Sequence, residues 1–506
     1  MGKFIEPNRR QYSLLPPSIE DWLPENHLAR FVVETVEVLD LSPIYARYSE
    51  KGGRAFSPKL LVGLMFYGYA TGVFSSRKLE LASYDSVAFR YICANHHPDH
   101  DTIAHFRKRF LGELGQIFVQ ILLMARELGF GRVGQVNIDG TKIQANASKH
   151  SAMSYDRIKK LEAQYQEEVA RLLSLAEAED QATYELDIPA ELALREERIA
   201  RLQRAREVLE ARAQADYEAQ QAEYEAKMAA RKEKEAQTGK KAGGRPPQPP
   251  SKEVDPKSQY NFTDEESRIM KTQGGFDQCY NAQAAVSNDM LVVGTHLSNQ
   301  PNDKEQLEPT LEAIPQAAGK VEAATADTGY FSEKNIQIAQ EAGIEPYIAT
   351  GRQPHNQWLS QQLDASTDQA IEPDQAPLTP KQRMSQKLKT SEGKERYRQR
   401  KMTVEPVFGI IKDIMGFRRF SLRGEQQAKG EWSLVCTAYN LKRLFNLIQQ
   451  REKSVQTAEN GPQKAPILQK LNSSLHRAAQ WIHTLCHHRS SHKQLRPLLV
   501  CLPTGC

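Results

Sequence analysis

The sequence predicts an α/β protein with a mixed-sheet core, an all-α N-terminal domain and an inserted, charged helical hairpin that resembles a coiled coil. Three observations predict this class. Residues 1–130 show helical periodicity without strand signals, residues 153–256 hold two charged amphipathic stretches, and residues 131–152 and 257–450 alternate strand-like and helical segments. Residues 451–506 carry few signals and are expected to form a poorly defined tail.

The first 130 residues are expected to form a helical domain that is large enough to hold its own core. Apolar residues recur at helical spacing over 27–39, 58–71, 76–83 and 111–128. We expect Asp101 to cap a further helix that bears Arg107 and Arg109. That basic helix would contact a DNA backbone, and an ordinary basic surface is the alternative.

The hairpin is predicted from apolar residues at steps of three and four among charges. They are Ile158, Leu161, Tyr165, Val169 and Leu172, followed after a break at Asp187-Ile188-Pro189 by Leu192, Ile199, Leu202 and Leu209. A Pro-rich linker at 243–250 ends the insert, because consecutive prolines cannot continue a helix. We expect the insert to lie between the first two strands of the core.

The core strands are expected in short apolar or alternating segments bounded by turn residues. They cover residues 133–145, 280–286, 290–297, 321–326 and 345–349. Helices are expected over 304–314, over 332–342, from about 394, and over 426–450. The Gln-, Ser- and Pro-rich segment 352–392 is predicted to be a flexible excursion.

The charge of the chain is concentrated in one segment. The whole sequence of 506 residues has a net charge of only +4, but thirteen Lys or Arg and four acidic residues fall within 381–423. This local excess predicts a phosphate-binding surface, with a solvated basic loop as the alternative. No apolar run reaches the ~18 residues of a membrane span, and the N-terminus lacks a signal peptide. The expected location is therefore the cytoplasm.

Three carboxylates have positions that suit a metal site. Asp139 lies in the first core strand before Gly140, Asp327 closes a later strand, and Glu405 lies in the basic segment. Strand-borne acids of neighbouring strands can converge at a sheet edge, and carboxylates in a basic cleft would hold Mg²⁺ together with a substrate phosphate. An aspartate before glycine is also a common turn residue, and Asp277 and Asp303 likewise neighbour expected strands. The pattern alone therefore leaves the triad open.

Several ordered motifs resemble the insertion-sequence transposases of the DDE class, whose catalytic core is RNase H-like. They are NIDGTKIQANAS around Asp139, ADTGYFSEKN around Asp327, and the series Tyr397, Arg400, Glu405 and Lys412. The N-terminal block up to DTIAHFRKRF is similar to the helical domain that precedes such cores. Together the resemblance spans about residues 10–446.

The resemblance implies the roles of individual residues. Asp139, Asp327 and Glu405 would be catalytic and would hold two Mg²⁺ ions, with Mn²⁺ as an alternative ion. Lys412 would neutralise phosphate, and Tyr397 would pack or hydrogen-bond at the DNA end.

Two residues of the third motif depart from the family pattern. Four residues separate Arg400 from Glu405, where the family has three, so the phosphate-binding role of the signature arginine falls to either Arg400 or Lys401, which stands at the usual spacing. Pro406 follows Glu405, so that the helix is expected either to kink there or to start there. Downstream of it, Glu405, Phe408 and Lys412 are expected to share one helical face.

The function predicted on these grounds is DNA transposition. The enzyme would bind the terminal inverted repeats of its element, cleave phosphodiester bonds at the ends, and join the 3′-hydroxyls to target DNA as a homodimer or larger synaptic complex. One alternative is an RNase H-like metal-dependent nuclease without strand transfer. Another is a non-catalytic DNA-binding derivative of a transposase, and a third is a helical scaffold built on the hairpin.

Overall fold

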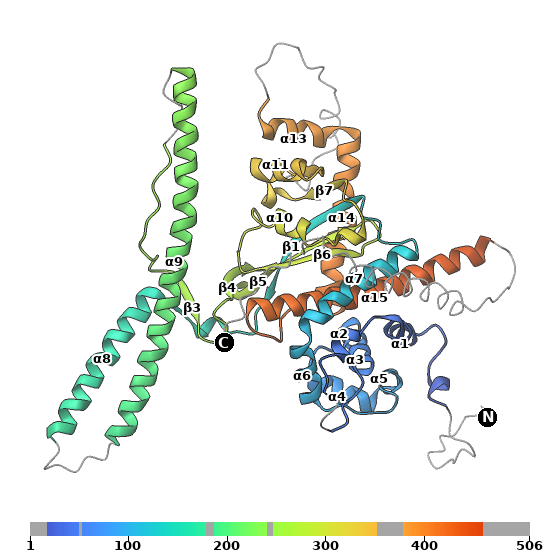
Figure 1. Ribbon diagram of the computed structural model, residues 1–506, viewed down its shortest axis with the longest axis horizontal. Helices are drawn as coiled ribbons and strands as arrows, with labels where there is room; N and C mark the ends of the chain where they lie inside the picture. Colours follow the sequence, from blue (N-terminus) through green and yellow to red (C-terminus); the bar gives the residue numbers. More distant parts are fainter. Residues whose placement is uncertain (1–17, 50–52, 179–186, 240–245, 352–377, 459–506) are drawn as a thin grey trace, which may run out of the picture. The chain divides into compact units, whose positions relative to one another are not determined.

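A computed structural model of the chain describes residues 18–49, 53–178, 187–239, 246–351 and 378–458 (Figure 1). The chain divides into two compact units. The first comprises Met1–Gln144 and Tyr280–Cys506, and the second comprises Ala145–Cys279. Each unit is described by itself.

The N-terminal part of the first unit is helical, as expected. After a 3-10 turn at Ile19–Trp22 it contains α1 (Leu28–Val38), α2 (Ser42–Tyr45), α3 (Pro58–Ala70), α4 (Ser76–Asp85), α5 (Val87–Ile92), α6 (His100–Arg109) and α7 (Leu111–Glu127). Helix α3 is buried almost all round, and its Gly68 leaves room for Leu79 of α4. The cap of α6 is Asp99, whose Oδ1 accepts from Thr102 N at 2.8 Å. The expectation that Asp101 caps this helix is therefore wrong, because the helix begins two residues earlier, at His100.

The strands of the first unit have the order β5-β1-β7-β8, and β6 also pairs with β5. The strands are β1 (Gln135–Gln144), β5 (Gly275–Ser287, which begins in the second unit), β6 (Val292–Ser298), β7 (Ala323–Ala326) and β8 (Glu345–Ile348). Strand β7 is parallel to both β1 and β8, whereas β5 and β6 are antiparallel. The sheet is therefore mixed, and its parallel strand β7 is buried throughout, as expected for a strand covered on both faces.

Helices pack around this sheet (Figure 1). They are α10 (Leu307–Glu312), α11 (Glu333–Glu341), α13 (Pro380–Lys389), α14 (Ser391–Gly409) and α15 (Glu425–Ala458), with 3-10 turns at Gln316–Ala318 and Thr328–Tyr330. Helix α14 packs against β1, β7 and β8, and α15 packs against α3, α7 and β6. Helix α14 runs through Pro406 and continues into a π-helix, Ile410–Ile414. Pro406 therefore does not start a helix.

The second unit contains the helical hairpin (Figure 1). A short antiparallel pair, β2 (Ala152–Ser154) and β3 (Gln259–Asn261), flanks α8 (Tyr155–Ala178) and the long α9 (Ile188–Thr238). The buried seam consists of Ile158, Leu202, Ala205, Leu209 and Tyr260. A 3-10 turn at Lys149–Ser151 precedes β2, and β4 (Arg268–Thr272) pairs with the first residues of β5. Three seam residues were predicted from their spacing, whereas β2, β3 and β4 were not.

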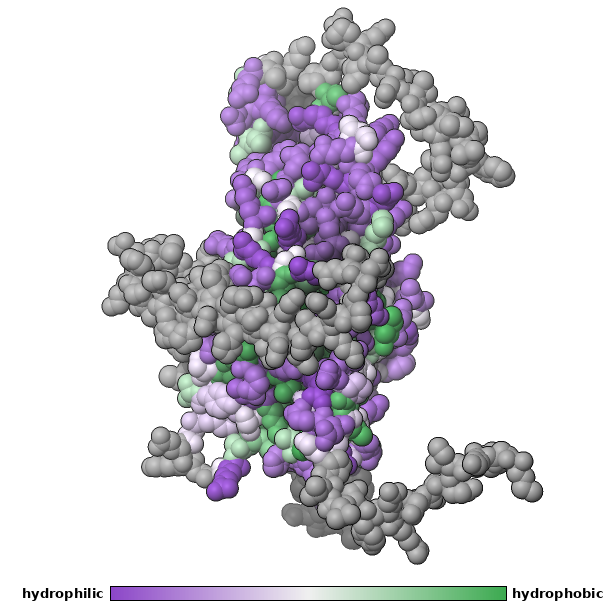
Figure 2. Space-filling model, turned by 90° about the vertical axis from the view of Figure 1, so that its right-hand side faces the viewer, coloured by the Kyte–Doolittle hydropathy of each residue, from purple (hydrophilic) through white to green (hydrophobic). Residues whose placement is uncertain are grey.

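These elements confirm the predicted α/β class with a helical N-terminal region and an inserted helical hairpin. A flexible excursion was predicted for residues 352–392. Helix α13 occupies part of this segment, and residues 352–377 lie outside the described residues. Most of the expected C-terminal tail, 459–506, also lies outside them. In the part of the chain that the structure describes, no helix is long and apolar enough to cross a membrane. On the face shown in Figure 2, hydrophobic residues form small separate areas among hydrophilic ones.

Candidate active site

Asp139 of β1 and Asp327, which directly follows β7, come from two neighbouring parallel strands. Asn137 of β1 pairs with Thr325 of β7, and each aspartate lies two residues further along the chain, Asp327 just beyond the end of its strand in extended conformation. Parallel strands lie about 4.8 Å apart, and residues two apart point to the same face, so this register places the carboxylates side by side. Backbone amides fix both side chains, since Asp139 Oδ1 accepts from Gly140 N at 2.9 Å and Asp327 Oδ1 accepts from Gly329 N at 2.8 Å.

Glu405 joins these aspartates through Arg400, which lies one and a half turns earlier on α14. Arg400 Nη2 lies 2.9 Å from Asp139 Oδ2 and 3.9 Å from Asp327 Oδ2, and Nη1 lies 3.1 Å from Glu405 Oε1. The Arg400 side chain is only 8% exposed, and its Nε is buried without a hydrogen-bond partner among the described residues. The structure thus brings the three predicted carboxylates together around one guanidinium.

Burial dominates the electrostatics of this cluster. It raises the pKa of Asp139 to about 6, against the opposing effect of Arg400, and the nearby Asp327 adds to the rise. Tyr397 on α14 lies within electrostatic reach of Arg400 and of all three carboxylates, and burial raises the pKa of its phenol. A buried carboxylate next to two others needs a cation to remain charged, and Arg400 supplies one here.

The donor set also suits a divalent ion. Among the described residues, no group of three or more His, Cys, Asp or Glu side chains has a ready-made metal geometry, and Arg400 lies between the three carboxylates. The carboxylate oxygens that pair with the guanidinium are hard ligands of the kind that Mg²⁺ and Mn²⁺ prefer. Asp139, Asp327 and Glu405 therefore fit such an ion, provided that the Arg400 side chain moves aside.

The other predicted residues of α14 and its π-helix have different surroundings. Lys401 is exposed, one residue beyond the buried Arg400. Lys412 lies within the π-helix Ile410–Ile414, so the regular α spacing on which the face shared with Glu405 and Phe408 was predicted does not extend to it. Lys412 Nζ instead donates to Lys142 O of β1 at 3.0 Å.

The two arginines of α6 separate into an interior and a surface residue. Arg107 is 6% exposed, and its Nη1 donates to Tyr69 Oη and to Phe74 O, both at 2.9 Å. Tyr69 Oη in turn donates to the buried Glu431 Oε1 at 3.2 Å. This interior position does not suit the phosphate contact expected of Arg107. Arg109 is exposed, although its Nη2 donates to Arg47 O at 2.6 Å.

A fourth carboxylate near the cluster, Asp303, was not selected from the sequence. It lies between β6 and α10, and its Oδ1 accepts from Asn281 Nδ2 at 2.6 Å and from Gln283 Nε2 at 2.9 Å. The only sequence signal was its position near an expected strand, which Asp277 shares. Asp277 instead accepts from Thr272 Oγ1 within the β4–β5 hairpin.

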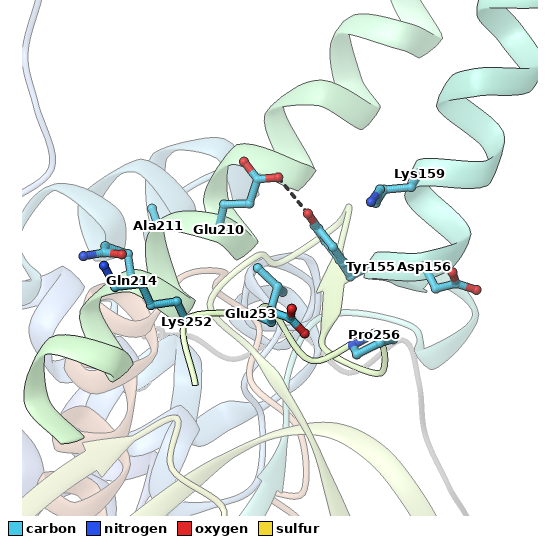
Figure 3. A pocket seen from close by; sticks show the side chains of 10 residues that line it. Tyr155, Asp156, Lys159, Glu210, Ala211, Gln214, Lys252, Glu253 and Pro256 are labelled. Carbon is cyan, nitrogen blue, oxygen red and sulfur yellow. Dashed lines mark hydrogen bonds between the residues drawn. The ribbon is translucent and has the colours of Figure 1, made fainter. Parts of the chain in front are cut away.

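A hollow of about 700 Å³ lies elsewhere, at the base of the hairpin in the second unit (Figure 3). Its wall includes Tyr155, whose hydroxyl donates to Glu210 at 2.8 Å, together with Lys159 and Lys252. The candidate active site is the cluster around Arg400, where three carboxylates pair with one guanidinium.

Comparison with known proteins identifies the class of the two parts of the chain. The family described as the transposase DDE domain matches residues 245–441, and a second family, described as a transposase domain, matches residues 17–109. The first match includes Asp327 and Glu405, while Asp139 lies outside it. No curated protein and no solved structure gives a significant match.

The two matches cover more than half of the chain and cover both its helical N-terminal part and most of its core. The chain therefore belongs to the insertion-sequence transposases of the DDE family, as the sequence motifs predicted. The RNase H-like class of the core is confirmed with it.

Proposed function

We propose that the protein is an active DNA transposase. It binds the terminal inverted repeats of its element, cleaves the phosphodiester bonds at the ends and joins the freed 3′-hydroxyls to target DNA. The observation that carries this proposal is the convergence of Asp139, Asp327 and Glu405 on one cationic group. The family match, which includes two of the three carboxylates, supports it.

In this proposal Asp139, Asp327 and Glu405 hold two Mg²⁺ ions, or Mn²⁺ in their place. When bound, two such ions activate the attacking oxygen and stabilise the leaving oxygen of an in-line displacement at phosphorus. Cleavage and joining are the same substitution, with water or a 3′-hydroxyl as the attacking group, so one set of carboxylates serves both.

The surrounding residues bind and orient the DNA. Lys401 is exposed beside the cluster and neutralises phosphate as a point charge, and Lys412 does so from the π-helix. Tyr397 packs or hydrogen-bonds at the DNA end. Arg400 reaches phosphate only after its guanidinium leaves the carboxylates.

The domain boundaries proposed from the sequence assign a role to each part. Residues 1–130, including exposed Arg109, bind the element ends, and residues 131–152 with 257–450 form the catalytic core. Residues 153–256 form the inserted hairpin, which can serve DNA contact or dimerisation. Synapsis of two ends requires a homodimer or a larger complex, acting in the cytoplasm on nucleoid DNA.

Glu405→Gln tests the proposal, with Glu395→Gln as a matched control on the same helix. Glu395 is exposed and pairs with Arg398 at 3.0 Å. Purified variants are incubated with Mg²⁺, a DNA carrying both terminal repeats, and a target plasmid. We expect Glu405→Gln to bind DNA but neither cut nor join it, because a carboxylate ligand is lost, while Glu395→Gln behaves as the native chain.

The outcomes separate the alternatives. Cut ends without joined products from the native chain would favour the nuclease, and DNA binding without any cleavage would favour the non-catalytic derivative. Undiminished cleavage by Glu405→Gln would refute the assignment of this carboxylate.

A further inference from the structure

Asp303 is tied to the central strands of the first unit by several donors. In addition to Asn281 and Gln283 of β5, Lys142 of β1 lies with its Nζ 3.3 Å from Asp303 Oδ1. Both β5 side chains are fully buried, and the Asp303 side chain is 25% exposed. One loop carboxylate thus receives hydrogen bonds from two strands that support the candidate active site.

The same carboxylate lies against Gly140, which follows Asp139 within β1, and against the turn that follows Asp327. A Cβ atom on Gly140 would lie 2.8 Å from Asp303 Oδ1 and 2.3 Å from Gln283 Nε2. A Cβ atom on Gly329 would lie 3.6 Å from Asp303 Oδ2 and 3.0 Å from Asp327 Oδ1. Gly140 and Gly329, which follow Asp139 and Asp327 by one and two residues, therefore leave room for the approach of Asp303.

Tyr330 contacts the same group of polar side chains through Gln283. It is completely buried, and its hydroxyl donates to Gln283 Oε1. Burial raises the pKa of Tyr330 well above its usual value, and the charges of Asp303, Asp139 and Asp327 raise it further. The phenol therefore stays protonated and remains a donor, which fixes the orientation of Gln283 toward Asp303.

We propose that Asp303 is a positioning residue, which holds β1 at Gly140 and the turn after β7 so that Asp139 and Asp327 face a common divalent ion. This inference rests on the proposed function. Its carboxylate, unlike an amide, keeps a negative charge toward Lys142 and offers only acceptor atoms toward the Asp327 turn. Loss of an outer partner of this kind typically weakens metal affinity by about 10–100-fold.

The test measures Mn²⁺ affinity of the full-length protein by electron paramagnetic resonance, without DNA. Asp303→Asn is compared with Asp289→Asn, whose native carboxylate accepts from Gly131 N at 2.8 Å as an ordinary structural bond. We expect Asp303→Asn to weaken Mn²⁺ binding at least about tenfold and Asp289→Asn to leave it unchanged. Asp303→Glu, which retains the charge, should recover part of the affinity.

Asn281→Ala provides a second measurement if Asp303→Asn does not fold, since it removes one donor and keeps the carboxylate. It should weaken Mn²⁺ binding severalfold. Native affinity in folded Asp303→Asn or in Asn281→Ala would overturn the inference, and so would equal losses in Asp303→Asn and Asp289→Asn. If the native chain and Glu405→Gln bind Mn²⁺ equally, Glu405 is not a metal ligand, and the proposed function itself is refuted. If Glu405→Gln loses binding and Asp303→Asn does not, only the role of Asp303 fails.

Discussion

Replacement of Arg400 by alanine removes the cation on which three carboxylates converge. The contacts are 2.9 Å to Asp139, 3.1 Å to Glu405 and 3.9 Å to Asp327. Asp327 and Glu405 are 41% and 48% exposed, so water screens them and they contribute little to the loss. Asp139 is 17% exposed, and leaving such a charge unpaired costs about 3–5 kcal/mol.

We expect a loss at the lower end of that range, because the pKa of Asp139 is already raised and the variant can protonate it. A divalent ion should stabilise Arg400→Ala more than the native chain, since it no longer competes with the guanidinium for the same oxygens. A tenfold gain in affinity corresponds to about 1.4 kcal/mol of additional stabilisation.

The assay is urea unfolding of the full-length protein at about pH 8, in EDTA or in excess MnCl₂, where a paired Asp139 is ionised. The control is Arg396→Ala on the same helix, where the native arginine pairs with exposed Glu392 at 2.8 Å. Equal stability of Arg400→Ala and the native chain in EDTA would refute the reasoning. If Mn²⁺ stabilises Arg400→Ala and the native chain by the same free energy, the guanidinium and the ion do not compete for the same oxygens.

Three further results are expected. Glu34 is a partly buried acid in α1 whose pKa is raised to about 7 by burial. Its stabilising contribution is complete below its usual pKa of 4.5 and is lost as the pH rises through 7. In urea titrations, Glu34→Gln should therefore gain stability relative to the native chain between about pH 5 and about pH 8. Ile158→Ala should destabilise the hairpin by about 2–5 kcal/mol in thermal melts followed by circular dichroism, whereas Leu173→Ala, at a residue that is 49% exposed, should change little. Lys401→Ala should lower the slope of log affinity against log salt by about one in filter binding, and an unchanged slope would remove exposed Lys401 from the DNA surface.

Local patterns predicted the parts of the fold that depend on local periodicity. The hairpin seam followed from apolar spacing, because Ile158 of α8 and Leu202 and Leu209 of α9 recur at helical steps and pack into one buried cluster. The strands that carry Asp139 and Asp327 were found from short apolar segments, but their parallel register was not, since it depends on pairing between distant segments.

Residues whose environment comes from distant segments could not be predicted. Arg107 looked like a surface charge on a basic helix, yet it is buried because Tyr69 and Glu431 provide polar partners from other helices. Pro406 suggested a helix boundary, but packing of α14 on three strands outweighs the lost hydrogen bond. Asp303 has no local motif, and only the folded loop brings it to Gly140 and Gly329.

The π-helix Ile410–Ile414 allows the length of this segment to change by one residue. A π turn holds one more residue than an α turn, so it has the geometry of a single-residue insertion absorbed by a continuous helix. Deleting one of its residues would restore regular α geometry and keep everything downstream near its present orientation relative to Glu405. Buried Met415 and Phe417 would then stay in their pockets. During divergence of related chains, a one-residue deletion should therefore be tolerated here, as substitutions at exposed Ile414 are.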